Sequence, residues 1–157
     1  MRAIAFDVGQ KRTGVAVSDA TGTLARPLQV LGADAVDEAV ALIVSLREEP
    51  DGLGAVVVGW PRRLDGSDTS ETPTVRAFAQ SLEAATGLPV TLQDERLTSV
   101  EAEQRLAERE PDWRARKRKI DAAAAAIILQ DYLDARARER ALVGLETVGG
   151  EHGDDQA

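Results

Sequence analysis

The sequence predicts a single α/β domain with a mixed five-stranded sheet flanked by helices. Two observations support this fold class. The first thirty residues contain three short apolar runs joined by turns, which is typical of strands connected in hairpin succession. The remainder alternates helix-like and strand-like segments and includes a long alanine-rich stretch, which indicates strands joined by helical crossovers and therefore parallel pairing.

The first three strands are expected at about residues 2–6, 13–18 and 24–31. The first two are apolar runs separated by Gly9 and a polar turn, as in a hairpin. From Asp34 to Glu48, apolar residues then recur at roughly helical spacing. A helix should follow the third strand directly.

The middle of the chain continues the alternation. Residues 55–59 are β-branched, short and bounded by glycines, which favours a buried strand. Residues 61–71 are rich in turn formers and predict a long exposed loop, a kind of segment that often carries function. A helix over about 73–86 should end at Gly87, because glycine can adopt the left-handed conformation there, and residues 89–93 should form the fifth strand.

Two helices complete the predicted domain. Thr98-Ser-Val-Glu101 has the spacing of a capping box, so one helix should start at Thr98 and end at Pro111. The other covers about residues 117–138, where an alanine run has high helix propensity and neither glycine nor proline occurs. The resulting element order, β-β-β-α-β-α-β-α-α, is the ribonuclease-H-like pattern.

Length and composition limit the domain organisation. The chain has 157 residues, of which 43% are hydrophobic, so it can bury one core but not two. Residues 1–140 are expected to form the domain. Residues 141–157 are glycine-rich and acidic, with too little apolar surface to offset the entropy of ordering, and predict a disordered tail.

Composition also excludes several protein classes. With no cysteine, the chain can form neither disulfides nor a thiolate metal site, which fits a reducing cytoplasm. We find no secretory signal and no stretch near the ~20 uninterrupted apolar residues that a membrane span needs. We therefore expect a soluble, cytoplasmic protein with no membrane partner.

The net charge of −8 argues, taken alone, against a nucleic-acid partner, because phosphate binding depends on clustered Lys and Arg. The distribution of charge qualifies that argument. Basic residues gather in three short groups that the fold could bring together, although each could equally be solvated surface charge. The groups are Lys11 with Arg12, Arg62 with Arg63, and the five basic residues between 114 and 119.

Carboxylates lie where an α/β sheet places its ligands. Asp7 ends the first strand, and Asp94 and Glu95 follow the fifth, so these side chains should meet at the carboxyl edge of the sheet. Asp121 lies on or beside the apolar face of the last helix. Each has an alternative interpretation: a turn former for Asp7, favourable helix N-terminal charge for Asp94 and Glu95, and an exposed first turn for Asp121.

Together these carboxylates predict a chemistry. Asp7, Glu95 and Asp121 would form a hard-oxygen site suited to Mg²⁺ or Mn²⁺, and two such ions could cleave a phosphodiester. Zinc is disfavoured because the sole histidine, His152, lies in the predicted tail. Basic side chains could grip the substrate phosphates, since Arg offers a bidentate fork and Lys a point charge. These candidates are Lys11, Arg12, Arg62, Arg63, Arg96, Lys117 and Lys119. Trp60 could stack a base, although a packed Trp is the more usual arrangement.

At these positions the sequence resembles the YqgF/RuvX family of Holliday-junction-resolvase-like proteins and precursor 16S ribosomal RNA nucleases. Four segments carry the resemblance, in order, within about residues 1–135. They are Phe6-Asp-Val-Gly-Gln-Lys-Arg-Thr-Gly-Val-Ala16, Val57-Val-Gly-Trp-Pro-Arg-Arg-Leu-Asp-Gly66, Asp94-Glu-Arg-Leu-Thr-Ser99, and residues 117–130. One departure is Trp60, where the family commonly has a smaller aliphatic residue.

The resemblance implies a ribonuclease-H-like fold, catalytic carboxylates at Asp7, Glu95 and Asp121, and processing of the 5′ end of precursor 16S ribosomal RNA by endo- or exonucleolytic cleavage. A Holliday junction resolvase is the first alternative, and it would require a homodimer because two symmetric strands are cut. A non-catalytic nucleic-acid- or ribosome-binding module is the second. An actin-like ATPase is disfavoured, because such enzymes close two domains over a nucleotide.

Overall fold

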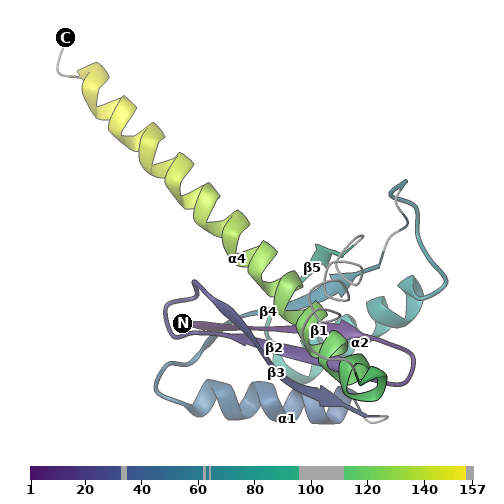
Figure 1. The fold of residues 1–157 in the computed structure, drawn as a ribbon. Coiled ribbons are helices and arrows are strands. Elements are labelled where there is room, and N and C mark those ends of the chain that lie inside the picture. Colours follow the sequence, from purple (N-terminus) through teal and green to yellow (C-terminus); the bar gives the residue numbers. More distant parts are fainter. Residues whose placement is uncertain (33–34, 62, 64, 96–111, 155–157) are drawn as a thin grey trace.

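A computed structural model of the chain describes residues 1–32, 35–61, 63, 65–95 and 112–154 (Figure 1). Its centre is one sheet of five strands, in the order β3-β2-β1-β4-β5. The strands are β1 (Arg2–Val8), β2 (Thr13–Ser18), β3 (Ala25–Leu31), β4 (Leu53–Trp60) and β5 (Val90–Asp94).

The strand directions confirm the predicted mixed sheet. β1 pairs antiparallel with β2, and β2 pairs antiparallel with β3, as short hairpin connections require. β4 pairs parallel with β1 and with β5. One helix separates β4 from β3 and another separates β5 from β4, and such helical crossovers favour parallel strands. β1 therefore lies at the centre of the sheet, where the antiparallel and parallel halves meet.

Helices cover both faces of the sheet. α1 (Ala35–Glu48) and α2 (Thr72–Thr86) pack on one face, and α4 (Trp113–Asp154) crosses the other (Figure 1). The two faces differ in side-chain size. Alternate residues of β1 show this, because Ile4 and Phe6 point toward α1 and α2 whereas Ala3 and Ala5 point toward α4.

The small residues on the second face let α4 approach the sheet closely. Gly14 of β2 faces α4, and a Cβ atom there would lie only 1.8 Å from the backbone oxygen of Asp121. Ile128 and Leu129 are fully buried against this face. The Gln130 side chain accepts a hydrogen bond from Ala25 N–H at 2.9 Å and donates one to Thr23 O at 2.9 Å, so α4 is also tied to the start of β3.

The helices predicted at about 34–48 and 73–86 agree with α1 and α2, whereas α4 begins at Trp113 instead of near Lys117 and ends later than predicted. Gly87 caps α2 with a left-handed φ of 71°, as its sequence position indicates. The predicted end of α4 near residue 138 is wrong, because the helix continues to Asp154 through most of the segment expected to be a disordered tail. Residues 139–148 contain a single glycine and otherwise tolerate helix, which explains the extension as far as residue 148. The domain boundary at residue 140 stays a prediction, and the predicted helix over 98–111 lies outside the described residues.

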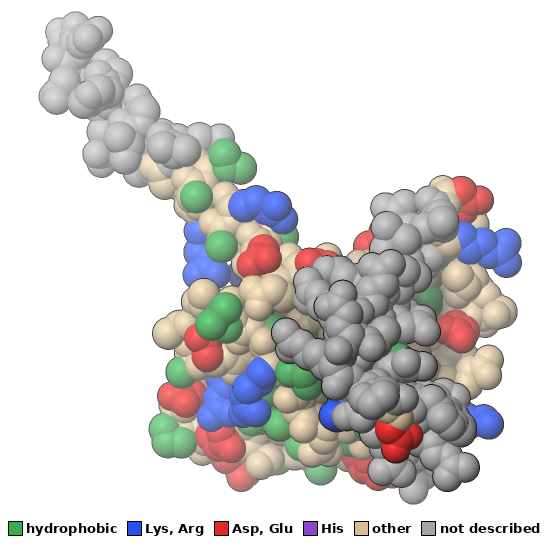
Figure 2. All heavy atoms as spheres, viewed as in Figure 1, with side chains coloured by type: hydrophobic (Ala, Val, Ile, Leu, Met, Phe, Trp, Pro, Cys, Tyr) green, Lys and Arg blue, Asp and Glu red, His purple; other side chains and the backbone are tan. Residues whose placement is uncertain are grey.

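The far part of α4 projects away from the sheet (Figure 1). On the projecting stretch Lys or Arg side chains lie beside hydrophobic ones (Figure 2). Leu142 and Val143 are both 61% exposed there, so these two side chains lie outside the core. Among the described residues, we find no helix with the length and apolar character that crossing a membrane requires.

Candidate active site

Asp7 stands on the face of the sheet that α4 covers. Side chains alternate along a strand, and Ala3 and Ala5 already point toward α4, so Asp7 points the same way near the carboxyl end of β1. Asp94 ends β5 beside Trp60, the last residue of β4, and Glu95 follows with its N–H donating to Trp60 O at 3.3 Å. Two strand ends thus present carboxyls to one edge, as predicted.

A glycine on the intervening strand lets the two carboxyls meet. Gly59 of β4 lies between β1 and β5, and a Cβ atom there would lie 2.6 Å from Glu95 Oε2. The Glu95 side chain fills that space and forms a hydrogen bond with the Asp7 side chain. Any larger residue at position 59 would displace the Glu95 carboxyl.

The electrostatics of this pair follow from burial and like charge. Burial, then the neighbouring charge of Asp7, raises the pKa of Glu95 to about 10. Burial also raises the pKa of Asp7, with smaller contributions from the charges of Asp121 and Glu71, while the hydrogen bond with Glu95 offsets part of that rise. Near neutral pH the pair therefore holds a proton, with Glu95 donating to the Asp7 carboxylate.

Asp121 reaches the same edge from α4. Gly14 pairs with Asp7 across the β1–β2 ladder, and the backbone of Asp121 packs directly on Gly14, so the helix brings Asp121 beside Asp7. Its Oδ2 atom is buried and lies 3.1 Å from Arg12 Nε, an ion pair in which both side chains are about one third exposed. Within the part of the chain that the structure describes, no three acidic or histidine side chains stand close enough to share a metal ion.

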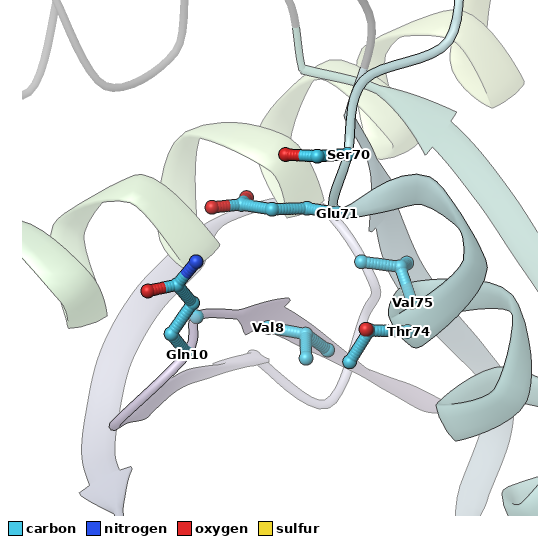
Figure 3. Close-up of a pocket in the computed structure, with 7 residues that line it drawn as sticks. Val8, Gln10, Ser70, Glu71, Thr74 and Val75 are labelled. Carbon is cyan, nitrogen blue, oxygen red and sulfur yellow. The ribbon is translucent and has the colours of Figure 1, made fainter.

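The structure adds Glu71, which the sequence did not single out. Glu71 is the residue before α2, at the end of the loop predicted over residues 61–71. Its carboxylate extends toward α4 and Gln10 (Figure 3), and its charge acts on both Asp7 and Glu95. An acidic residue just before a helix is common, so only its place in a functional-looking loop could have drawn attention to it.

An open cleft adjoins Asp121 and Glu71, whereas Asp7 and Glu95 are not among its lining residues. It measures about 300 Å³, and its walls come from the β1–β2 turn, the start of α2 and the first half of α4. Its lining residues are Gly9, Gln10, Lys11, Arg12, Glu71 and Asp121. The cleft therefore combines a basic pair with acidic side chains, which is the composition that a phosphate ester with a counter-cation would require.

The predicted phosphate-binding residues fall into separate groups. Lys11 and Arg12 line the cleft. Arg63 is exposed in the loop before α2, and Lys119 is exposed on α4. Lys117 belongs to α4 by its backbone, but its side chain is not described, and Arg62 and Arg96 lie outside the described residues.

Trp60 does not face the cleft. It is 7% exposed and packs in the core between the sheet and the two helices α1 and α2. The guanidinium of Arg76 lies 5.2 Å from the centre of its ring. Trp60 is therefore packed in the core and is not placed to stack a base.

Comparison with known proteins places these features in a family. A family model described as "RuvX: Holliday junction resolvase" matches residues 1–135. A protein of Chloroflexus aurantiacus named "Putative pre-16S rRNA nuclease" is 46% identical over 133 residues, which cover 85% of this chain and 86% of that protein. One of the same name from Pelotomaculum thermopropionicum is 40% identical over 150 residues, covering 96% of this chain and 97% of its own length.

Solved structures resemble the chain in fold. A T. thermophilus RuvC in complex with Holliday junction substrate has a TM-score of 0.51 at 19% identity, covering 87% of this chain and 96% of that one. The fowlpox virus Holliday junction resolvase has a TM-score of 0.50 at 13% identity, covering 86% of this chain and 99% of that one. At these identities the likeness concerns the fold alone, and it confirms the ribonuclease-H-like prediction.

Fold, carboxyl edge and relatives together define the class: this is a nuclease, a hydrolase that acts on phosphodiester bonds. Nucleic acid is therefore its partner. Within that class, the chain belongs to the RuvX family, whose model matches nearly all of the sequence up to the middle of α4.

Proposed function

We propose that the chain is a metal-dependent nuclease that processes the 5′ end of precursor 16S ribosomal RNA. The observation that carries the proposal is the hydrogen-bonded pair of carboxyls, Asp7 and Glu95, at the carboxyl edge of the sheet, with Asp121 brought beside Asp7 by α4. Two adjoining carboxyls that must hold a proton at neutral pH form a site where a divalent cation can take the place of that proton.

The residues fit magnesium or manganese. Both ions prefer oxygen ligands, and the edge offers carboxyl oxygens and no sulfur or imidazole from the described residues. Asp7 and Glu95 would hold the ions, joined by Asp121 once its side chain turns toward them. One or two bound ions would activate a water and stabilise the leaving oxygen of the phosphodiester.

The protein's own residues would position the substrate. Lys11 and Arg12 line the cleft and would hold a phosphate there. Arg63 and Lys119 are exposed on flanking elements and would contact neighbouring phosphates. Arg62, Arg96 and Lys117 complete the proposed phosphate-binding set on the sequence argument alone.

The names of the relatives support RNA as the substrate. Two proteins that are 40% and 46% identical over most of their length both carry the name "Putative pre-16S rRNA nuclease". A protein in this role works in the bacterial cytoplasm, where ribosomes are assembled, and the absence of cysteine accords with that location.

A second candidate is a Holliday junction resolvase, because the matching family model carries that description. A resolvase cuts two strands related by a twofold axis, so it must act as a homodimer, whereas RNA trimming needs one active site. Oligomeric state on a four-way junction therefore separates the two candidates.

The proposed function is tested by cleavage of matched RNA, DNA and four-way-junction substrates. Wild type and Asp7→Asn are compared in Mg²⁺, Mn²⁺ and chelator, with Asp19→Asn, an exposed acid on the β2–β3 turn, as a matched control. We expect RNA cleavage that needs metal, fails in Asp7→Asn and persists in Asp19→Asn. Junction cleavage by a dimer would support the resolvase, and binding of every substrate without cleavage would refute a nuclease.

A further inference from the structure

We propose that Arg12 is a positioning residue: it holds Asp121 away from the metal site until a substrate phosphate takes over its guanidinium. The proposal rests on the nuclease function above. The juxtaposition that carries it is the 3.1 Å contact between Arg12 Nε and Asp121 Oδ2, at the wall of the cleft. Arg12 thereby couples the binding of phosphate to the binding of metal.

The turn between β1 and β2 fixes where Arg12 stands. Gly9 N–H donates to the backbone oxygen of Arg12 at 2.9 Å, which closes the turn directly after the strand that ends with Asp7 and Val8. A Cβ atom at Gly9 would lie 2.6 Å from that oxygen, so the tight turn requires glycine. Arg12 is consequently held within reach of both the cleft and α4.

The three predicted catalytic acids are divided between two arrangements. Asp7 and Glu95 form a hydrogen bond with each other, whereas Asp121 forms an ion pair with Arg12. This division agrees with the finding that no three acidic side chains of the described residues are close enough to share an ion. For Asp121 to join the other two, its carboxylate must turn away from Arg12.

A phosphate can cause that change. The Arg12 and Asp121 side chains are 31% and 27% exposed and both line the cleft, so a phosphate there can reach the Arg12 guanidinium although Asp121 Oδ2 itself is buried. A guanidinium binds a phosphate through two parallel hydrogen bonds, which compete with its single Nε contact to a carboxylate. A released Asp121 carboxylate then adds its negative charge to the metal site, next to Asp7.

The mechanism predicts reciprocal linkage, because two ligands that favour the same rearrangement strengthen each other's binding by the same factor. A partly exposed ion pair is worth at most about 1 kcal/mol, so breaking it should change metal affinity by up to about fivefold. An enzyme with this arrangement would hold metal weakly until its substrate is in place.

Titration of the full chain with Mn²⁺, with free Mn²⁺ followed by electron paramagnetic resonance, tests the linkage. The probe for phosphate is sulfate, compared with chloride at matched ionic strength. Arg12→Gln is compared with Lys11→Gln, which removes the same charge from the same cleft without touching the ion pair. Sulfate also pairs with Mn²⁺ in solution, but it does so equally for every protein. Comparing both variants in both buffers therefore removes this contribution from the measured affinities.

We expect Arg12→Gln to bind Mn²⁺ more tightly than Lys11→Gln in chloride, by up to about fivefold. Sulfate should raise the Mn²⁺ affinity of wild type and, at a higher sulfate concentration, that of Lys11→Gln, which has lost one phosphate-binding group, and should leave that of Arg12→Gln unchanged. Asp121→Asn, which breaks the pair from the other side, should also lose the sulfate effect. Circular dichroism of each variant establishes that it is folded.

Equal Mn²⁺ affinity in the two Gln variants, with the sulfate effect intact in Arg12→Gln, would overturn the coupling while leaving the nuclease proposal standing. A different result would contradict the proposed nuclease function itself. If Asp7→Asn binds Mn²⁺ as tightly as wild type, the metal site is wrongly placed, and both proposals fail together.

Discussion

Replacing Glu95 with Gln should make the metal-free protein more stable at neutral pH. In the native state burial and the charge of Asp7 raise the pKa of Glu95 from 4.5 to about 10. The folded protein therefore binds this proton more tightly than the unfolded chain does. The stabilisation is complete below pH 4.5 and is lost as pH rises toward 10.

The magnitude follows from the distance between the solution pH and the unfolded pKa. Each pH unit above 4.5 costs about 1.4 kcal/mol of unfolding free energy. At pH 7 the cost is at most about 3–4 kcal/mol. It is smaller to the extent that Glu95 shares its proton with Asp7. Gln resembles the protonated acid in shape and can donate a hydrogen bond to Asp7. The free energy of unfolding of Glu95→Gln should therefore not fall in this way as pH rises.

Urea unfolding in chelator, at intervals from pH 4.5 to 8, measures the effect. The free energy of unfolding of Glu95→Gln should exceed that of wild type by an amount that grows with pH. Glu38→Gln, an exposed acid on α1, serves as the control and should follow wild type. A difference between Glu95→Gln and wild type that stays constant over this range would refute the shared proton.

Three further substitutions test how the site is built. Gly14→Ala should destabilise the fold by about 1–3 kcal/mol and abolish cleavage, because its Cβ would meet the α4 backbone at 1.8 Å; urea unfolding measures the first effect. Gly59→Ala meets the movable ends of Glu95 and Ile128, so cleavage in Mg²⁺ should fall more than stability does. Trp60→Ala should cost about 3–5 kcal/mol, yet leave nucleic-acid affinity per folded molecule unchanged, because the ring is buried away from the cleft; weaker binding by the folded variant would contradict that placement.

Part of the structure can be predicted from local sequence. Short apolar runs joined by turns produce the antiparallel half of the sheet, and helix-length connections force the parallel half, because a crossover must return the chain to the same edge. Asp7 and Glu95 could be assigned to the carboxyl edge for the same reason, since Asp7 lies at the end of β1 and Glu95 directly follows β5. Gly87 ended α2 as expected because left-handed capping is a local property.

The remainder depended on contacts between residues that are far apart in the sequence. Asp121 lies beside Asp7 because α4 packs on Gly14, and no local sequence pattern predicts that close approach. Glu71 joined the site only because the start of α2 lies across the cleft from the β1–β2 turn.

The sequence by itself determined the five strands, the helices α1 and α2, the mixed strand pairing and two of the carboxyl positions, because propensity and connection length act within short stretches of chain. Tertiary structure decided that Trp60 faces the core and that Arg12 pairs with Asp121. Both depend on which side chains long-range packing brings within a few ångströms of each other, and that packing is a property of the whole fold.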